Sequence, residues 1–241
     1  RWRDHGGYEK AELDKSNPLF GLIEQFVQDH GGKNSSRQTK HCVKRVEIIR
    51  NWDLIHQFEM AVKLKKDERE QNPDVFVKST RDIIGGDQQK AYVYERVKQS
   101  KKRAAAILDE KESEEVSLLV TLHGASESAV DSICSFGAKD LRRTDPGFAV
   151  AGIYSTLQAE YASLYSAMTN SSVLIMCCCV VGNVYPLSRR RDYRPPFDKE
   201  YFTPHGEAAH SAYFGGQGVA LKPSYDAHWF TVAQPRAGSI N

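Results

Sequence analysis

The sequence lacks a long run of apolar residues. Its longest, Val173–Val181, falls well short of the roughly 20 residues that a membrane-spanning helix needs. This absence predicts that the chain does not span a membrane and has no membrane partner.

An excess of charge of one sign is also lacking. The chain carries 33 Lys and Arg against 31 Asp and Glu, a formal net charge of +2. So small an excess gives no general attraction to nucleic acid, which would need a local basic patch. The charge runs between positions 98 and 115 are interpreted as a solvated helix face. The sequence does not exclude nucleic acid as a partner.

The cysteines are few and do not form the even, spaced framework of a secreted, disulfide-linked domain. There are five, and three are adjacent at 177–179. In a strand, alternation sends Cys177 and Cys179 to one face and Cys178 to the other, so the three cannot share a zinc ion. We expect buried structural thiols, no metal, and a reducing, intracellular location in the cytoplasm or nucleus.

Several familiar catalytic motifs are missing. The chain has no Gly-x-Ser-x-Gly, no Walker loop and no Gly-x-Gly-x-x-Gly, which argues against serine hydrolases, nucleotide kinases and dinucleotide dehydrogenases. His205 and His210 are five residues apart, so a helix would hold their imidazoles about 140° apart, which does not suit a shared metal. The chain begins without Met or an apolar leader, which predicts a piece of a longer protein.

What is present is a strand, helix, strand, helix pattern between Leu118 and Tyr165. The β-branched and leucine-rich run 116–122 predicts a strand that ends at His123-Gly124. Ser126 is placed to cap a helix that Gly137 ends. An imidazole at the open end of a buried strand is well placed for function.

The second half of this pattern brings aromatic side chains to the same region. A turn is predicted at 145–147 and Tyr154 at the end of a second strand. The following helix carries Tyr161 and Tyr165 one turn apart on one face.

The length predicts one large domain or one and a half, since 241 residues with 40% hydrophobic content can bury a core. The expected elements are a helix from Pro18 to about Gly31, a strand over 41–50, a helix capped by Asn51, a connection over 72–86, a helix over 87–115 and a surface loop over 187–211.

These motifs together resemble the catalytic core of poly(ADP-ribose) polymerase-type ADP-ribosyltransferases, which are related in fold to diphtheria toxin. The shared pattern is His123-Gly124 after a strand, a helix closing at Gly137, Gly152-Ile153-Tyr154, and Tyr165 eleven residues after Tyr154. The segment ending in Val181-Gly-Asn-Val-Tyr-Pro186 resembles the family's next strand.

The resemblance implies an α+β fold with two antiparallel sheets around an NAD cleft and flanking helices. Residues 1–115 would form an N-terminal layer of helix and strand, and 116–241 the core. NAD would be a substrate, cleaved between nicotinamide and ribose through an oxocarbenium-like state. ADP-ribose would pass to a protein acceptor.

The resemblance also assigns roles to residues. His123 would bind a ribose hydroxyl, the Gly124 backbone would hold the nicotinamide carboxamide, and Tyr154 and Tyr165 would flank the nicotinamide ring. Where the family commonly has a serine that contacts the carboxamide, this chain has Ala162, with Ser163 beside it as a candidate substitute. Ala125 replaces the usual Thr or Ser after His-Gly, and Ser155 replaces the usual Phe, which is a milder departure.

The family's catalytic glutamate, which stabilises the sugar cation, is not evident. Counting back from Ala233-Gln234 places Asp226 at that position, one methylene shorter. Alternatively, Tyr225-Asp226-Ala227-His228 matches a segment that lies before the final strand, and the core lacks its last strand. The sequence leaves both interpretations open.

Three functions follow from these observations. The first is a mono-ADP-ribosyltransferase, since a shortened or missing glutamate argues against chain elongation. The second is an ADP-ribosyltransferase-like interaction module without catalysis. The third is an NAD glycohydrolase with water as acceptor.

Overall fold

The described part of the chain is a set of helices around short strands. The computed structural model describes residues 3–4, 7–29, 42–73, 85–108, 118–138, 153–186 and 225–229. Its elements are β1 (Arg3–Asp4), β2 (Glu9–Glu12), α1 (Pro18–Asp29), β3 (Glu47–Arg50), α2 (Trp52–Gln71), α5 (Gln88–Leu108), β4 (Leu118–Gly124), α6 (Glu127–Phe136), α7 (Ala159–Ala167), β5 (Leu174–Val180), β6 (Val184–Pro186) and β7 (Ala227–Trp229).

The strands pair in three small groups. β1, β2 and β3 form an antiparallel sheet in that order, β4 and β5 form an antiparallel pair, and β6 and β7 a parallel one. In the β4–β5 pair, Leu118 lies opposite Val180 and Gly124 opposite Leu174. The fold is therefore of the α+β class, with small antiparallel sheets.

The helix ends follow from side chains a few residues away. The side chain of Asn51 accepts a hydrogen bond from Leu54 N at 3.1 Å and begins α2. Ser126 does the same for α6 through Ala129 N at 3.2 Å. Gly137 ends α6 at φ 77°, a conformation that suits a residue without Cβ. All three predicted caps are confirmed.

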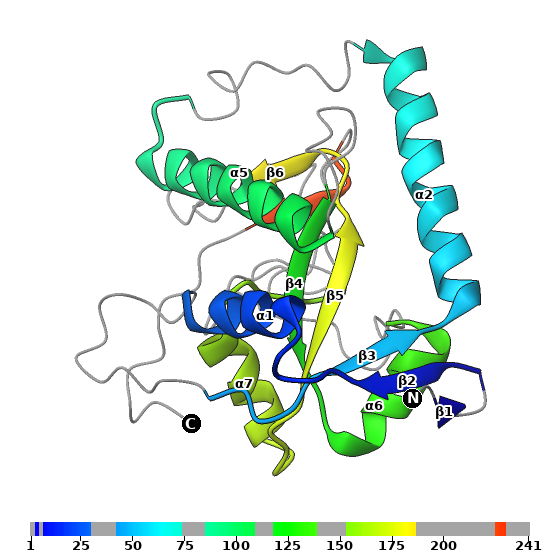
Figure 1. Cartoon of the computed structure of the whole chain (residues 1–241). Helices are drawn as coiled ribbons and strands as arrows, with labels where there is room; N and C mark the ends of the chain where they lie inside the picture. The colour runs from blue at the N-terminus through cyan, green and yellow to red at the C-terminus, as the bar shows by residue number, and fades with distance from the viewer. Residues whose placement is uncertain are drawn as a thin grey trace, which may run out of the picture.

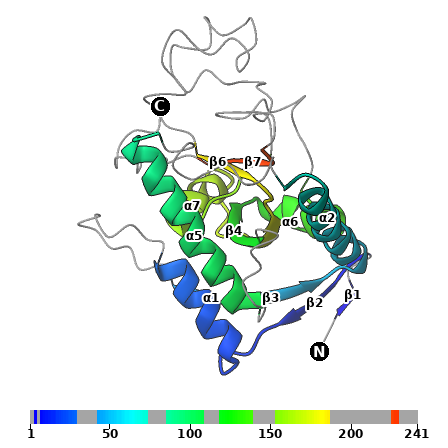
Figure 2. The same cartoon turned by 90° about the horizontal axis from the view of Figure 1, so that it is seen from above.

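The β4–β5 pair lies at the centre of the helices. Figures 1 and 2 show α1 and α5 on one side of it, α2 and α6 on the other, and α7 beside the end of β4 at which His123 lies. Phe26 of α1, Ala104 of α5 and Val120 of β4 share one buried cluster. The other buried members are Val27, Leu122, Leu157, Ala159 and Ala162.

This shared core bears on the expected boundary between residues 115 and 116. Phe26 and Ala104 come from the N-terminal side of it, and Val120 and Ala162 from the C-terminal side. The N-terminal layer therefore supplies apolar surface that covers β4. Burying a large apolar side chain contributes roughly 1.5–3 kcal/mol, so neither part completes this core by itself.

Several predicted strand bounds need correction. β3 covers 47–50 instead of 41–50, because its partner β2 offers only four residues to pair with, and residues 42–46 are described outside any strand. His123 and Gly124 lie inside β4, since they pair with Ile175 and Leu174. The charged sequence Glu9–Glu12 gave no sign of a strand. The parallel β6–β7 pair departs from the expected antiparallel arrangement.

The prediction that the three adjacent cysteines are buried is wrong for Cys178 and only partly met by the other two. Cys178 is exposed, whereas Cys177 and Cys179 are half-buried on the opposite face of β5. Thr121 Oγ1 lies 3.4 Å from Cys179 Sγ. Burial raises the pKa of Cys177 to about 12, so this thiol stays protonated and weakly nucleophilic at neutral pH.

Other expectations fall outside the described residues. These are the turn at 145–147, the loop at 187–211 with His205 and His210, and the ends of the helices expected at Gly31 and Glu115. Among the described helices, none combines the length and apolar character needed to cross a membrane.

Candidate functional site

His123 is held in one tautomer by the backbone. Its Nδ1 lies 2.9 Å from the carbonyl oxygen of Tyr154. A carbonyl only accepts hydrogen bonds, so Nδ1 carries the proton and donates it. In the neutral ring, Nε2 is then left with a lone pair that can accept a hydrogen bond from a ligand hydroxyl.

The segment that carries Tyr154 is fixed by pairing with β4. Leu122 N donates to Thr156 O at 2.6 Å, and Thr156 N donates back to Leu122 O at 2.9 Å. This single bridge continues the antiparallel pattern, so Tyr154 reaches the level of Gly124 at the end of the strand. The predicted meeting of His123 and Tyr154 therefore occurs.

Gly124 is where α7 approaches β4. A Cβ built on Gly124 would overlap the carbonyl oxygen of Ala162, and it would also crowd Ser166 N at 3.1 Å. Ala162 itself is buried. The resemblance implies that the Gly124 backbone holds the nicotinamide carboxamide, but α7 occupies the side of Gly124 on which a side chain would stand.

The tyrosines form a cluster on α7. The rings of Tyr161 and Tyr165 meet edge to face with centroids 5.5 Å apart, and their hydroxyls are 3.2 Å apart. Burial, followed by the hydrogen bond to Tyr165 and the nearby Tyr154, raises the pKa of Tyr161. Tyr165 remains exposed. Tyr161, which falls between Tyr154 and Tyr165 in the sequence, is therefore part of this cluster. The sequence marks it only as a residue of the helix face and gives it no role in the site.

Ser163 does not join this cluster. On a helix at about 100° per residue, it lies roughly 160–200° from Tyr161 and Tyr165. Its hydroxyl donates to the carbonyl oxygen of Glu160 at 2.7 Å. The structure therefore turns Ser163 away from the tyrosine face, which argues against its expected contact with a carboxamide.

Asp226 lies at the opposite end of the β4–β5 pair. Its neighbour Asn183 follows β5, and Val180 is five residues further along β5 than Ile175, the partner of His123. At about 3.3 Å per residue, roughly 16 Å of β5 lie between Ile175 and Val180, so Asp226 is at the far end of the pair from His123. The first of the two interpretations of Asp226, as the substitute for the catalytic glutamate, does not agree with this placement.

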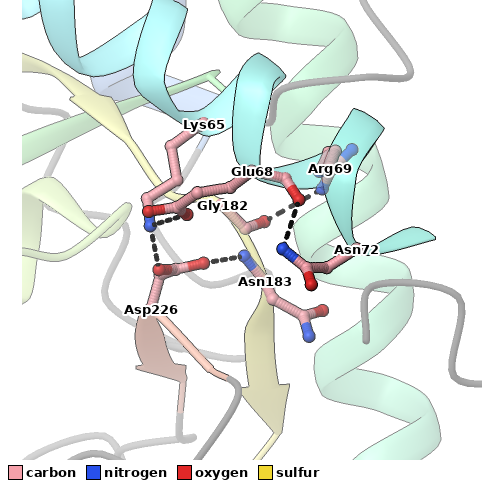
Figure 3. Close-up of polar contacts among 7 residues, drawn as sticks. All are labelled: Lys65, Glu68, Arg69, Asn72, Gly182, Asn183 and Asp226. Carbon is pink, nitrogen blue, oxygen red and sulfur yellow. Dashed lines mark hydrogen bonds and ion pairs between the residues drawn. The ribbon is translucent and has the colours of Figure 1, made fainter. Parts of the chain in front are cut away.

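The side chain of Asp226 instead joins α2 to the segments before β6 and β7 (Figure 3). Lys65 Nζ lies 2.5 Å from Asp226 Oδ1, and Asn183 N donates to Oδ2 at 2.6 Å. Lys65 also pairs with Glu68 at 2.7 Å. Gly182 packs so closely that a Cβ there would overlap the Asp226 carboxylate. Nothing in the sequence marks a contact between residues 161 positions apart.

The network around Lys65 changes the pKa of its ammonium group. Burial alone would lower the pKa of Lys65, but the hydrogen bonds and charges of Asp226 and Glu68 outweigh it and raise the pKa. The folded pKa thus lies above the unfolded value of 10.5. The network stabilises the fold fully below that value and loses its contribution as the pH rises through the folded pKa.

We expect Asp226→Asn to lower the stability of the fold rather than to change the site around His123. The change removes a charged partner from Lys65 and Asn183 N, which should cost on the order of 1–3 kcal/mol in the free energy of unfolding. Glu68→Gln, at the more exposed partner of Lys65, should cost about 0–1 kcal/mol. Urea unfolding measures both variants. An Asp226→Asn protein of unchanged stability that has lost NAD turnover would instead support a catalytic Asp226.

Comparison with known proteins gives no match: no protein-family model fits this sequence, and no curated protein is significantly similar to it. Within the described residues, no three His, Cys, Asp or Glu side chains come together in a way that could hold a metal ion.

Proposed function

We propose that this chain binds NAD at the end of β4, cleaves the bond between nicotinamide and ribose, and transfers a single ADP-ribose to a protein acceptor. The observation that carries the proposal is the geometry of His123. Its Nδ1 is used by Tyr154 O, and Nε2 is the acceptor that remains for a ribose hydroxyl. Tyr161 and Tyr165 lie on α7, the helix that approaches Gly124, and offer flat surfaces for a nicotinamide ring.

The reaction would break the glycosidic C–N bond, and nicotinamide would leave with the bonding electron pair. A nucleophile of the acceptor protein would then attack the sugar carbon and release its proton to solvent. The site's task is to hold the leaving group and the ribose in a reactive orientation, which can lower the barrier substantially. A fixed imidazole and an aromatic cluster suit that task.

One observation favours a second candidate. The carboxylate of Asp226 is engaged with Lys65 and Asn183 at the other end of the β4–β5 pair. A site without a carboxylate for the sugar cation would bind NAD and fail to cleave it. The chain would then be an ADP-ribosyltransferase-like binding module.

One experiment separates these functions. The chain is incubated with NAD labelled in its adenylate part, and both protein labelling and nicotinamide release are followed. Labelled protein with equivalent nicotinamide indicates a transferase, and nicotinamide without labelling indicates a glycohydrolase. Saturable NAD binding without either product indicates the module. A folded chain that shows no binding would contradict all three.

Tyr165 provides a test of the binding site itself. We expect Tyr165→Ala to weaken binding of a nicotinamide analogue by roughly 2- to 12-fold, since an aromatic contact contributes about 0.5–1.5 kcal/mol beyond burial. Tyr165→Phe keeps the ring and should bind nearly as the wild type does. Tyr92→Ala, at an exposed tyrosine of α5, is the matched control. Isothermal titration calorimetry measures all three, and equal affinity for wild type and Tyr165→Ala would place the ligand elsewhere.

A further inference from the structure

One side of α2 contacts the rest of the chain. Leu54 packs against Gly137 after α6, and Lys65 and Arg69 reach Asp226 and the Gly182 carbonyl. These positions fall on one face of a helix with 3.6 residues per turn. The opposite face is turned outward, and Figure 1 shows α2 at the edge of the molecule. No residue of α2 is fully buried.

The outward face carries an apolar ridge. Trp52, Met60 and Leu64 are 58%, 55% and 56% exposed, and with His56 they occupy positions four residues apart. Residues at this spacing form a continuous ridge along a helix, the kind that packs into the groove of a second helix. We call Trp52, His56, Met60 and Leu64 the outer ridge.

Two opposite charges flank this ridge. Glu59 and Lys63 are also four residues apart and follow the same edge of the outer ridge. Both are exposed, and neither forms an ion pair within the part of the chain that the structure describes.

We propose that the outer ridge of α2 is a self-association surface, covered by the α2 of a second copy of this chain in antiparallel orientation. With the two-fold axis near Ala61, Glu59 of each copy faces Lys63 of the other, and the two Met60 side chains lie near the axis. A parallel arrangement would instead set like charges opposite each other. In this register charge is complementary at Glu59 and Lys63. Met60 and Leu64 of the two copies form the apolar contact, while Trp52 lies opposite the C-terminal turn of the other α2.

The size of this surface sets the strength of the association. α2 is 20 residues long, or about 30 Å. One face of such a helix is smaller than the roughly 800 Å² per partner of a standard stable interface. The dimer therefore forms and dissociates with protein concentration.

Sedimentation equilibrium over a wide concentration range tests the association. We expect the wild type to shift from monomer to dimer, and Leu64→Glu to raise the dissociation constant roughly 100-fold. Tyr92→Glu introduces the same charge at a side chain of α5 that is also 56% exposed, and it should dimerise like the wild type. Circular dichroism checks that each variant is folded. A wild type that stays monomeric, or a dimer that Leu64→Glu leaves unchanged, would overturn the proposal.

Charge exchange tests the orientation. Glu59→Lys alone and Lys63→Glu alone should each weaken the dimer roughly tenfold, because every facing pair becomes repulsive. An equimolar mixture of the two variants should recover the wild-type dissociation constant, since one copy then presents two lysines to the two glutamates of the other. Single variants that associate as tightly as the wild type would refute the antiparallel pairing.

Discussion

Gly124→Ala should lower the melting temperature by roughly 2–12 °C, the largest stability effect that we expect from a single added methyl group in this chain. The new Cβ would overlap the carbonyl oxygen of Ala162, which is backbone and cannot rotate aside. Relieving the overlap requires α7 to move away from β4. Overpacking of this kind costs about 1–3 kcal/mol or more, and each kcal/mol is about 2–4 °C for a chain of this size.

The same displacement should carry Tyr161 and Tyr165 away from β4, so binding of a nicotinamide analogue should fall together with stability. Gly21→Ala in α1 is the matched control, since a Cβ there meets nothing within 4 Å. A helical glycine replaced by alanine should gain about 0.5–1 kcal/mol. Differential scanning calorimetry of both variants measures the contrast. A Gly124→Ala protein as stable as the wild type would show that α7 does not pack against β4 in this way.

His123→Ala should reduce NAD turnover on the order of 10- to 100-fold and lower the melting temperature by only about 1–6 °C. The imidazole is half-buried, and its single hydrogen bond within the described residues is to Tyr154 O. Losing that bond should cost about 0.5–1.5 kcal/mol of stability. Losing the Nε2 contact to a ribose removes both a bond and an orientation that counts more in the transition state.

Two further variants separate these contributions. His123→Asn keeps a donor near the position of Nδ1, so it should retain stability and lose turnover. His123→Gln keeps an acceptor near the position of Nε2, so it should retain more turnover and lose some stability. Thermal unfolding and nicotinamide release are measured on the same samples. Full turnover in His123→Asn would refute a ligand contact at Nε2.

Much of the local structure could be predicted because its causes lie within a few residues. Asn51 and Ser126 cap helices through amides three positions ahead, and Gly137 ends α6 because it adopts a positive φ. The run of apolar residues before His123 defined β4 nearly to the residue. The contact of His123 with Tyr154 also followed from their places at the ends of neighbouring elements, and the contact of Tyr161 with Tyr165 followed from their spacing on one helix face.

Other features depend on contacts that the order of residues does not contain. Asn51 also donates to Cys134 O, 83 positions away, and so joins the start of α2 to the end of α6. Ser163 is different, because its direction relative to Tyr161 and Tyr165 follows from about 100° per residue and could have been predicted once the helix was assigned.

The sequence by itself determined the helix caps, the strand before His123, the spacing of the tyrosines and the lack of an apolar run long enough for a membrane helix, because each depends on neighbours within a short stretch of chain. Only the tertiary structure decided that α7 packs against Gly124 and that Asp226 forms an ion pair with Lys65 at the far end of the β4–β5 pair. Those outcomes depend on how separate elements pack, since a carboxylate is held by whichever cation and amides the fold brings within hydrogen-bonding distance.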